Sequence, residues 1–157
     1  NGSVLPFFRK LLANGAKELP ITDERMTRFW ITLTQGVRFV LSSAEIMRGG
    51  EVFIPKIPSM KGVDLGGHRT IKKKIKIVGI RPGEKLHEAM STEDDARNML
   101  ELSDRYIIVP ELTFWNSSNH VSDGARRVED SFRYASNTNN EWLTDESLRM
   151  LLEEAEE

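Results

Sequence analysis

Cysteine is absent from the sequence of 157 residues. Its absence excludes a disulfide framework, a thiolate nucleophile and a zinc site built on cysteine ligands. Long apolar runs are missing as well, because no stretch approaches the roughly 20 consecutive apolar residues that a membrane-spanning helix needs. The first residues also lack the pattern of a signal peptide. We therefore expect a soluble, cytoplasmic protein with no membrane partner.

A strong excess of one charge is also absent. The formal net charge is -2, whereas a dedicated nucleic-acid-binding domain is usually distinctly basic. His68, His87 and His120 stand on different segments without a partner at helical spacing, so we expect no metal site. The one basic run lies between Arg69 and Lys76. A solvated strand edge explains it best, and a contact with nucleic acid is the alternative.

Enough apolar residues are present for one core, and we treat residues 1–157 as a single domain. Predicted strands alternate with predicted helices, which indicates the α/β class. Residues 111–140 are rich in Asn, Ser and Gly, and we expect an irregular loop segment there. Helices are expected over Val4–Asn14, Leu33–Met47, Ser59–Leu65, Lys85–Met90 and after Thr144, and strands over Val52–Ile57, Ile75–Ile80 and Tyr106–Val109.

The clearest helix start is Thr32-Leu33-Thr34-Gln35, which has the pattern of a capping box. Five apolar residues then recur at helical spacing, and we expect them to form a buried stripe of the core. These residues are Val37, Val40, Leu41, Ala44 and Met47.

The stretch from Ile75 to Glu88 carries the strongest local signal of a ligand site. Apolar β-formers lead into Arg81-Pro82-Gly83-Glu84, which predicts a buried strand ending in a Pro-Gly turn at a sheet edge, where ligands usually bind. The guanidinium of Arg81 suits phosphate, and the carboxylate of Glu84 suits sugar hydroxyls. On the turn alone, a solvated Arg and Glu at the surface is the alternative interpretation.

Four blocks extend this signal over almost the whole chain. They read SVLPFFRKLLANGAKELPITDERMTRFWITLTQGVRFVL, GGEVFIPKIPSMKGVDL, IVGIRPGEKLHEAM and FRYASNTNNEWLT. In this order they resemble the C-terminal half of the inverting UDP-N-acetylglucosamine 4,6-dehydratases, which are extended short-chain dehydrogenases/reductases of polysaccharide biosynthesis. The resemblance implies a small sheet with flanking helices, corresponding to the substrate-binding C-terminal part of an extended Rossmann-type dehydratase, with the cofactor half absent.

The resemblance also implies a site for a UDP-sugar. The residues that match substrate contacts of the family are Ser3, Val4, Pro20, Thr22, Arg28, Arg81 and Glu84. The first two stand at a helix start that meets a phosphate. The next two lie on the strand that passes the base and the ribose, and the last three hold the diphosphate and the ribose.

Two patterns of the family's first half are missing from this sequence. Neither Tyr106 nor Tyr134 has a lysine four positions further on, and no Gly-x-Gly-x-x-Gly occurs. In the family, the Tyr-Lys pair assists proton removal while hydride passes to the cofactor. We therefore expect no catalytic residue and no cofactor in this chain, whereas the full-length family uses NADP or NAD.

Two hypotheses of different classes follow. In the first, the chain is a truncated nucleotide-sugar 4,6-dehydratase-like protein that retains UDP-N-acetylhexosamine binding without catalysis. In the second, it is a non-catalytic, oligomerising interaction domain derived from such an enzyme, because losing half of a Rossmann sheet uncovers strand edges and apolar faces. The expected partners are a UDP-sugar and either a second copy of the chain or a missing N-terminal Rossmann half.

Overall fold

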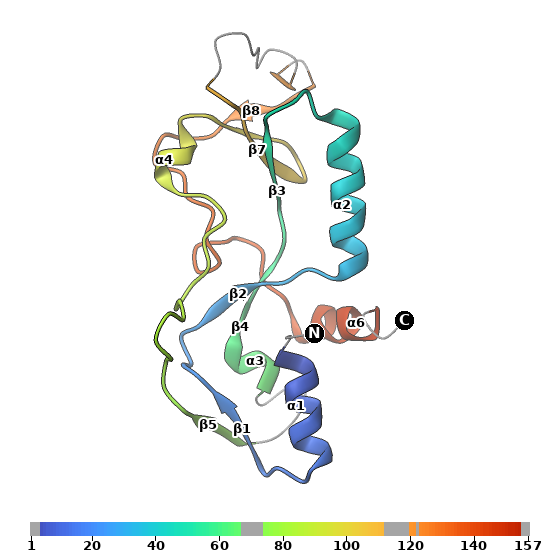
Figure 1. The fold of residues 1–157 in the computed structure, drawn as a ribbon, viewed down its shortest axis with the longest axis vertical. Coiled ribbons are helices and arrows are strands. Elements are labelled where there is room, and N and C mark those ends of the chain that lie inside the picture. Colours follow the sequence, from blue (N-terminus) through green and yellow to red (C-terminus); the bar gives the residue numbers. More distant parts are fainter. Residues whose placement is uncertain (1–3, 67–73, 112–119, 122, 155–157) are drawn as a thin grey trace.

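Small sheets and flanking helices follow one another along the long axis of the molecule (Figure 1). The structure is a computed structural model and describes residues 4–66, 74–111, 120–121 and 123–154. The elements are α1 (Val4–Ala13), β1 (Glu18–Ile21), β2 (Thr27–Phe29), α2 (Leu33–Ile46), β3 (Val52–Pro55), β4 (Ser59–Lys61), α3 (Gly62–Gly66), β5 (Lys74–Ile77), α4 (Glu93–Ala96), β6 (Met99–Glu101), β7 (Arg105–Ile108), β8 (Arg126–Arg127) and α6 (Asp145–Glu154). The predicted α/β class is confirmed. None of the helices in the described ranges combines the length and apolar character needed to cross a membrane.

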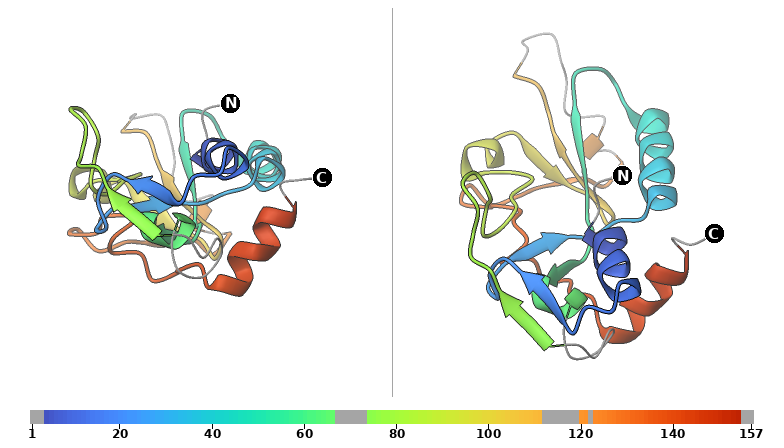
Figure 2. Two further views of the ribbon diagram at one scale, coloured as in Figure 1. Left: turned by 90° about the horizontal axis from the view of Figure 1, so that it is seen from below. Right: turned by 60° about the horizontal axis from the view of Figure 1, so that its bottom comes forward.

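One end of the molecule is built around the parallel pair of β1 and β5, with α1, α3 and α6 nearby (Figure 2). The buried side chains of this end are Phe8, Leu19, Ile21, Met60 and Leu148. Within the described residues β5 pairs on one side only, and Ile77 is 52% exposed. A strand therefore forms where the sequence predicts one, but the prediction that it is buried is wrong, because β5 lies at a sheet edge.

The other end contains a four-stranded antiparallel sheet in the order β3-β7-β6-β8. Ile107 of β7 lies at its centre and is fully buried. Neither β6 nor β8 was predicted from the sequence. Strand β8 lies inside segment 111–140, which was predicted to be irregular. Ala125, Val128 and Tyr134 of that segment are buried in the core, so its described part contributes to the fold.

One predicted helix is shortened, and another does not form. Residues Ser59–Lys61 form strand β4 against β2, and helix α3 begins only after it. Residues Lys85–Met90 form no helix. Their backbone groups bind other parts of the chain instead: the amide of Met90, for example, donates to the carbonyl of Tyr134 at 2.9 Å. Contacts distant in sequence therefore override the local preference of this segment.

The capping box at Thr32 is confirmed. The hydroxyl of Thr32 accepts the amide of Gln35 at 3.2 Å, and the Gln35 side chain accepts the amide of Thr32 at 3.1 Å. The helix packs on the sheet through its Phe39 and Ser43 side: Arg105 of β7 donates to the Ser43 hydroxyl at 2.9 Å and stacks over the Phe39 ring.

The apolar stripe of α2 is exposed, which contradicts the prediction that it forms part of the core. Leu33 is 85% exposed, Val40 is 65% exposed, and Val37, Leu41, Ala44 and Met47 are exposed as well. Helical spacing shows which residues share a face, but it does not show what covers that face. In the described residues the sheet occupies the opposite side of α2 and leaves the stripe in contact with solvent.

A buried contact between Glu51 and His120 joins the turn after α2 to residue 120. The carboxylate of Glu51 lies 2.9 Å from Nε2 of His120, and it accepts the amide of Arg48 at 2.7 Å. Burial alone would raise the pKa of Glu51, but the hydrogen bonds from His120 and the turn amides lower it below its ordinary value. These contacts keep Glu51 ionised and hold the residue before β3 against His120 and the turn after α2.

Tyr106 and Tyr134 occupy the core between the sheet and the later loop segment. The Tyr134 hydroxyl donates to the carbonyl of Ile57 at 3.0 Å, and the Ile57 amide donates to that hydroxyl at 2.9 Å. Burial raises the pKa of Tyr106 from 10.0 to about 12, and it also raises the pKa of Tyr134. Both phenols are therefore neutral in the folded protein well above neutral pH.

We expect the protein to lose stability in alkali because the unfolded chain releases these phenolic protons first. The contribution of the buried phenols to the free energy of unfolding is fully present below pH ~10. It is lost as pH rises through ~12, and Tyr106 accounts for about 3 kcal/mol of this loss. Urea unfolding at a series of pH values measures this loss. Tyr106→Phe should show a shallower decline above pH ~10. Equal slopes for the two proteins would assign the alkaline loss to other groups.

Candidate functional site

The carboxyl ends of β1 and β5 lie at the same edge of their sheet because the two strands run parallel. The pairing continues one residue further, since the amide of Val78 donates to the carbonyl of Ile21 at 2.9 Å. Thr22 leaves this edge from β1, and the chain after β5 leads to Arg81. Ligands of parallel sheets usually bind beyond the carboxyl ends of the strands. We refer to Thr22 and the turn Arg81–Glu84 as the β1–β5 edge.

The turn Arg81–Glu84 has the chemistry that its sequence indicates. Gly83 has φ +85°, which follows Pro82 as in a type II turn. The amide of Glu84 donates to the carbonyl of Arg81 at 3.0 Å, and the Arg81 amide donates to Oε2 of Glu84 at 3.0 Å. Both side chains are exposed, and the Arg81 guanidinium makes no ion pair among the residues that the structure describes. The turn therefore presents a cation beside a carboxylate without neutralising either one.

Arg28 lies on β2, and its guanidinium reaches the residues directly after the turn. It donates to the carbonyl of Lys85 at 2.9 Å and to that of Leu86 at 3.1 Å, and its Nε lies 3.5 Å from the Glu88 carboxylate. Arg28 therefore contacts the segment that directly follows the turn. Protein carbonyls occupy both terminal nitrogens of Arg28, because Nη1 also donates to the Thr27 carbonyl at 2.7 Å. The predicted phosphate contact of Arg28 stays a prediction.

Asp23 and Arg25 form an ion pair next to the end of β1. The Asp23 carboxylate accepts the Arg25 amide at 2.8 Å and the guanidinium at 2.8 and 2.9 Å. Hydrogen bonding from Arg25 lowers the pKa of Asp23 to about 2, and the charge of His87 contributes in the same direction.

Three polar side chains that the sequence analysis did not select meet behind this edge. The Thr27 hydroxyl lies 2.8 Å from Nδ1 of His87 and 2.7 Å from the hydroxyl of Ser136. Ser136 Oγ also accepts the amide of Glu88 at 2.9 Å. The three residues occur in three different family-like blocks, MTRFW, KLHE and FRYASN, which is the signal that would have found them. His87 does not lie on a helix, although the sequence predicts one over Lys85–Met90.

The remaining predicted site residues are placed as follows. Ser3 lies outside the described residues, and Val4 is the first residue of α1. Pro20 lies in β1 opposite Lys76, and Thr22 is half-buried immediately after the strand. Most of the basic run Arg69–Lys76 lies outside the described residues. Over the described ranges, no group of three or more His, Asp or Glu side chains is arranged to hold a metal ion.

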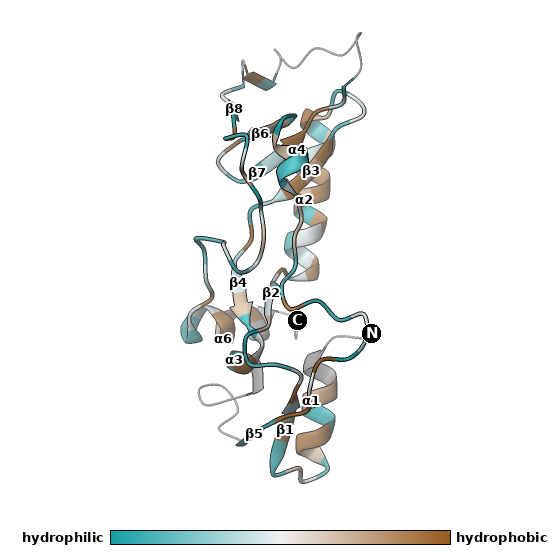
Figure 3. Cartoon of the chain, turned by 90° about the vertical axis from the view of Figure 1, so that its left-hand side faces the viewer, coloured by the Kyte–Doolittle hydropathy of each residue, from teal (hydrophilic) through white to brown (hydrophobic). Residues whose placement is uncertain are grey.

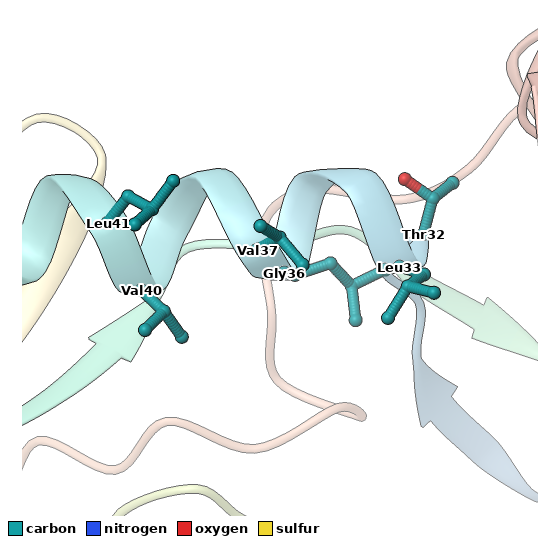
Figure 4. A pocket seen from close by; sticks show the side chains of 7 residues that line it. Thr32, Leu33, Gly36, Val37, Val40 and Leu41 are labelled. Carbon is teal, nitrogen blue, oxygen red and sulfur yellow. The ribbon is translucent and has the colours of Figure 1, made fainter.

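A second candidate surface is the exposed face of α2. An open, apolar groove of about 500 Å³ is lined by Ile31, Thr32, Leu33, Gly36, Val37, Val40 and Leu41, and we call it the α2 groove. Figure 4 shows these side chains projecting from one side of the helix and the residues before it. Hydrophobic colour marks parts of α2 in Figure 3. Contiguous exposed apolar surface of this kind usually marks an interaction site.

Comparisons with known proteins relate the chain to enzymes of nucleotide-sugar metabolism. A family model described as polysaccharide biosynthesis protein matches residues 1–110. An inverting UDP-N-acetylglucosamine 4,6-dehydratase of Campylobacter jejuni is 49% identical over 99% of this chain and 48% of that enzyme. A UDP-glucose 4-epimerase of Rickettsia akari is 30% identical over 96% of this chain and 45% of that enzyme.

A solved structure supports the same relation. The X-ray structure of Pen from Bacillus thuringiensis aligns with a TM-score of 0.78 and 30% identity, covering 99% of this chain and 47% of that one. This chain therefore spans about half the length of the curated relatives and of the solved structure that it matches.

Proposed function

Because the chain belongs to the family of polysaccharide biosynthesis proteins, we propose that it provides the UDP-sugar-binding half of an enzyme related to UDP-N-acetylglucosamine 4,6-dehydratase. The observation that carries this proposal is the β1–β5 edge, where Thr22 and the Arg81–Glu84 turn leave two parallel strands on the same side. The similarity to the Campylobacter jejuni enzyme over 99% of this chain supports the choice of ligand.

The groups at this edge suit the parts of a nucleotide sugar. The exposed guanidinium of Arg81 offers paired N–H donors to the diphosphate. One oxygen of Glu84 holds the Arg81 amide, and we assign the other oxygen to a ribose hydroxyl. Pro20 and Thr22 line the path of the base and ribose. Arg28 adds a second positive charge, and we assign its Nε, which has only the longer contact with Glu88 at 3.5 Å, to a phosphate oxygen of the bound ligand.

Chemistry on the sugar is assigned to groups outside these 157 residues. Oxidation at C4, loss of water across C5–C6 and return of the hydride need a nicotinamide cofactor and a proton-transfer pair. The sequence contains neither the dinucleotide fingerprint nor the Tyr-x-x-x-Lys pattern. The activity that we propose for this chain is therefore binding and orientation of the nucleotide sugar.

Isothermal titration calorimetry with UDP-N-acetylglucosamine tests this proposal. UDP-N-acetylglucosamine and UDP should both bind, because both carry the diphosphate and the ribose. N-acetylglucosamine alone should give no heat, because it carries neither group. The absence of binding by UDP-N-acetylglucosamine, or equal binding by the free sugar, would overturn the proposal.

The α2 groove supports a second role for the same chain as an assembly partner. We propose that the groove is covered by a polypeptide equivalent to the half of the relatives that this chain does not span. The relatives are about twice as long as the aligned region, so a second half of comparable size exists in them. Covering Leu33, Val40 and Leu41 removes the most exposed large apolar side chains of the helix from water, which contributes about 25 cal/mol per Å² of apolar surface.

The open edge of β3 favours a partner that contains strands. Within the described residues β3 pairs only with β7, so its other edge carries unpaired backbone groups. Val52 at the start of β3 is exposed beside this edge. An open edge is a template for a further strand. The open edge of β3 therefore offers a partner a second place to bind, in addition to the α2 groove.

Mixing experiments decide which polypeptide occupies the α2 groove. The probe is the half of the Campylobacter jejuni dehydratase that does not align with this chain. A one-to-one complex in light scattering is the expected result. A homodimer of this chain that persists in the presence of the probe would instead assign the groove to a second copy. A monomer under both conditions would leave no assembly role for the groove.

A further inference from the structure

Gly36 lies in the interior of helix α2 and lines the α2 groove. Glycine is less favourable than alanine inside a helix, because it loses more conformational freedom when the chain folds. The backbone at Gly36 does not have a positive φ, and a Cβ built on this residue would meet no atom within 4 Å. The packing of the described residues therefore gives no reason for a glycine at this position.

Four residues around this position have the spacing of a hole that accepts a side chain from a facing helix. Leu33, Gly36, Val37 and Val40 stand at positions i, i+3, i+4 and i+7 of α2. These are the four corners of a hole in knobs-into-holes packing. All four residues line the α2 groove (Figure 4). Because Gly36 has no side chain, this first hole has room for a large apolar side chain.

A second hole follows four residues later on the same face. Val37, Val40, Leu41 and Ala44 repeat the spacing, and all four are exposed. One corner is again small, because Ala44 carries only a methyl group. The two holes are displaced by about 6 Å along the helix axis, at 1.5 Å per residue. Two apolar side chains four positions apart on a facing helix have the same displacement, so one such helix can fill both holes.

The lining of the groove favours a helix over a strand as its occupant. A helix satisfies its own backbone groups, whereas a strand needs partners for its amides and carbonyls. Thr32 is the only polar side chain among the described lining residues, and its hydroxyl already accepts the Gln35 amide. No charged residue belongs to the lining. The groove therefore suits the apolar face of an amphipathic helix.

We propose that the α2 groove receives an amphipathic helix from the half of the relatives that this chain does not span, and that Gly36 determines the specificity of this contact. The relatives are about twice as long as the aligned region, so they contain a polypeptide large enough to supply the helix. The proposal rests on the assembly role proposed for the α2 groove. It adds the kind of element that docks there and the residue that makes room for its side chain.

Substitutions of Gly36 should affect the isolated chain and the complex in opposite directions. Gly36→Ala should raise the midpoint of thermal unfolding of the isolated chain by about 2–4 °C, because alanine favours the helix and its Cβ meets no atom. The same variant should bind the unmatched half of the Campylobacter jejuni dehydratase about 5-fold more weakly. Gly36→Leu fills the first hole and should bind it about 50-fold more weakly. Thermal unfolding and calorimetry measure the two effects.

Thr34→Leu is the matched control. Thr34 is exposed on the same helix and does not line the groove. The substitution adds the same leucine side chain outside both holes, so the affinity for the unmatched half should change less than about twofold. If Gly36→Leu also binds this probe as tightly as the unmodified protein does, the inference fails and the assembly role stands.

Photo-cross-linking identifies the element that occupies the groove. The sequence contains no cysteine, so Arg38→Cys, which is exposed beside the groove, carries a photoactivatable label at a single position. Mass spectrometry should find the label on a segment of the probe whose apolar residues recur three or four positions apart. A labelled segment with the alternating pattern of a strand would contradict the assignment of a helix.

The remaining outcomes separate the occupant from the surface. If the probe does not bind, but this chain forms a homodimer that Gly36→Leu dissociates, the occupant is a second copy and the proposed partner is wrong. If neither a complex nor a homodimer forms, the assembly role and this inference both fail. Binding of UDP-N-acetylglucosamine is a separate measurement, and its presence or absence leaves the result for the groove unchanged.

Discussion

Replacing Arg81 with alanine is expected to weaken the binding of UDP-N-acetylglucosamine by about 10- to 100-fold. Charge-assisted hydrogen bonds contribute about 1.5–3 kcal/mol each, and the exposed Arg81 guanidinium has no ion-pair partner among the described residues that would compete with a diphosphate. Glu84 also loses the cation beside it, so its carboxylate then repels the anionic ligand. Isothermal titration calorimetry at low ionic strength measures the change.

Arg126→Ala is the matched control for this substitution. Arg126 is also an exposed arginine, but it lies in β8 at the other end of the molecule. The Arg126→Ala substitution removes the same charge without altering the β1–β5 edge, so the affinity for UDP-N-acetylglucosamine should change less than about twofold. Equal losses for the two variants would mean that the ligand responds to net charge only, and the assignment of Arg81 to the diphosphate would fail.

Introducing aspartate at Val40 is expected to abolish the complex formed through the α2 groove, by at least about 100-fold in affinity. Val40 is 65% exposed in the isolated chain, so the carboxylate is solvated and the chain should remain folded. In the complex, the same carboxylate would be removed from water against an apolar partner without a compensating hydrogen bond, which costs several kcal/mol. Light scattering and calorimetry of the mixture with the unmatched half of the Campylobacter jejuni enzyme measure the loss.

Arg38→Gln provides the control on the same helix. Arg38 is exposed and does not line the α2 groove, and its replacement changes the net charge by the same amount as Val40→Asp. Assembly should survive this change. If Val40→Asp leaves the complex intact, the groove is not the contact surface. Thermal unfolding of each variant alone establishes that differences in assembly do not arise from loss of the fold.

Local chemistry explains which parts of the fold were predictable. The capping box of Thr32 with Gln35 needs only residues three positions apart, and the structure contains both of its hydrogen bonds. The Pro82-Gly83 turn is similarly local, because Gly83 adopts the positive φ that the turn requires. By contrast, the residues at Lys85–Met90 look helical by sequence and are not, because their carbonyls and amides bind Arg28 and Tyr134.

The same distinction between local and long-range contacts applies to the residues of the candidate site. The resemblance selected Arg81, Glu84 and Thr22, and the parallel pairing of β1 with β5 brings the ends of both strands to one edge. It did not select His87, which meets Thr27 across 60 positions, nor Ser136, which meets Thr27 across 109. Spacing carries no signal over such separations, since only the folded chain brings these side chains into contact.

The amino-acid sequence by itself determined the family, the helix start at Thr32 and the turn that carries Arg81, because each depends on neighbouring residues or on order along the chain. Only the tertiary structure decided that the apolar stripe of α2 faces solvent, that the Arg28 guanidinium holds the backbone after the turn, and that His87 ends a buried hydroxyl chain. The physical reason is that the burial and the hydrogen-bond partners of a side chain depend on the segments packed against it. Those segments are distant in sequence and meet only when the chain folds.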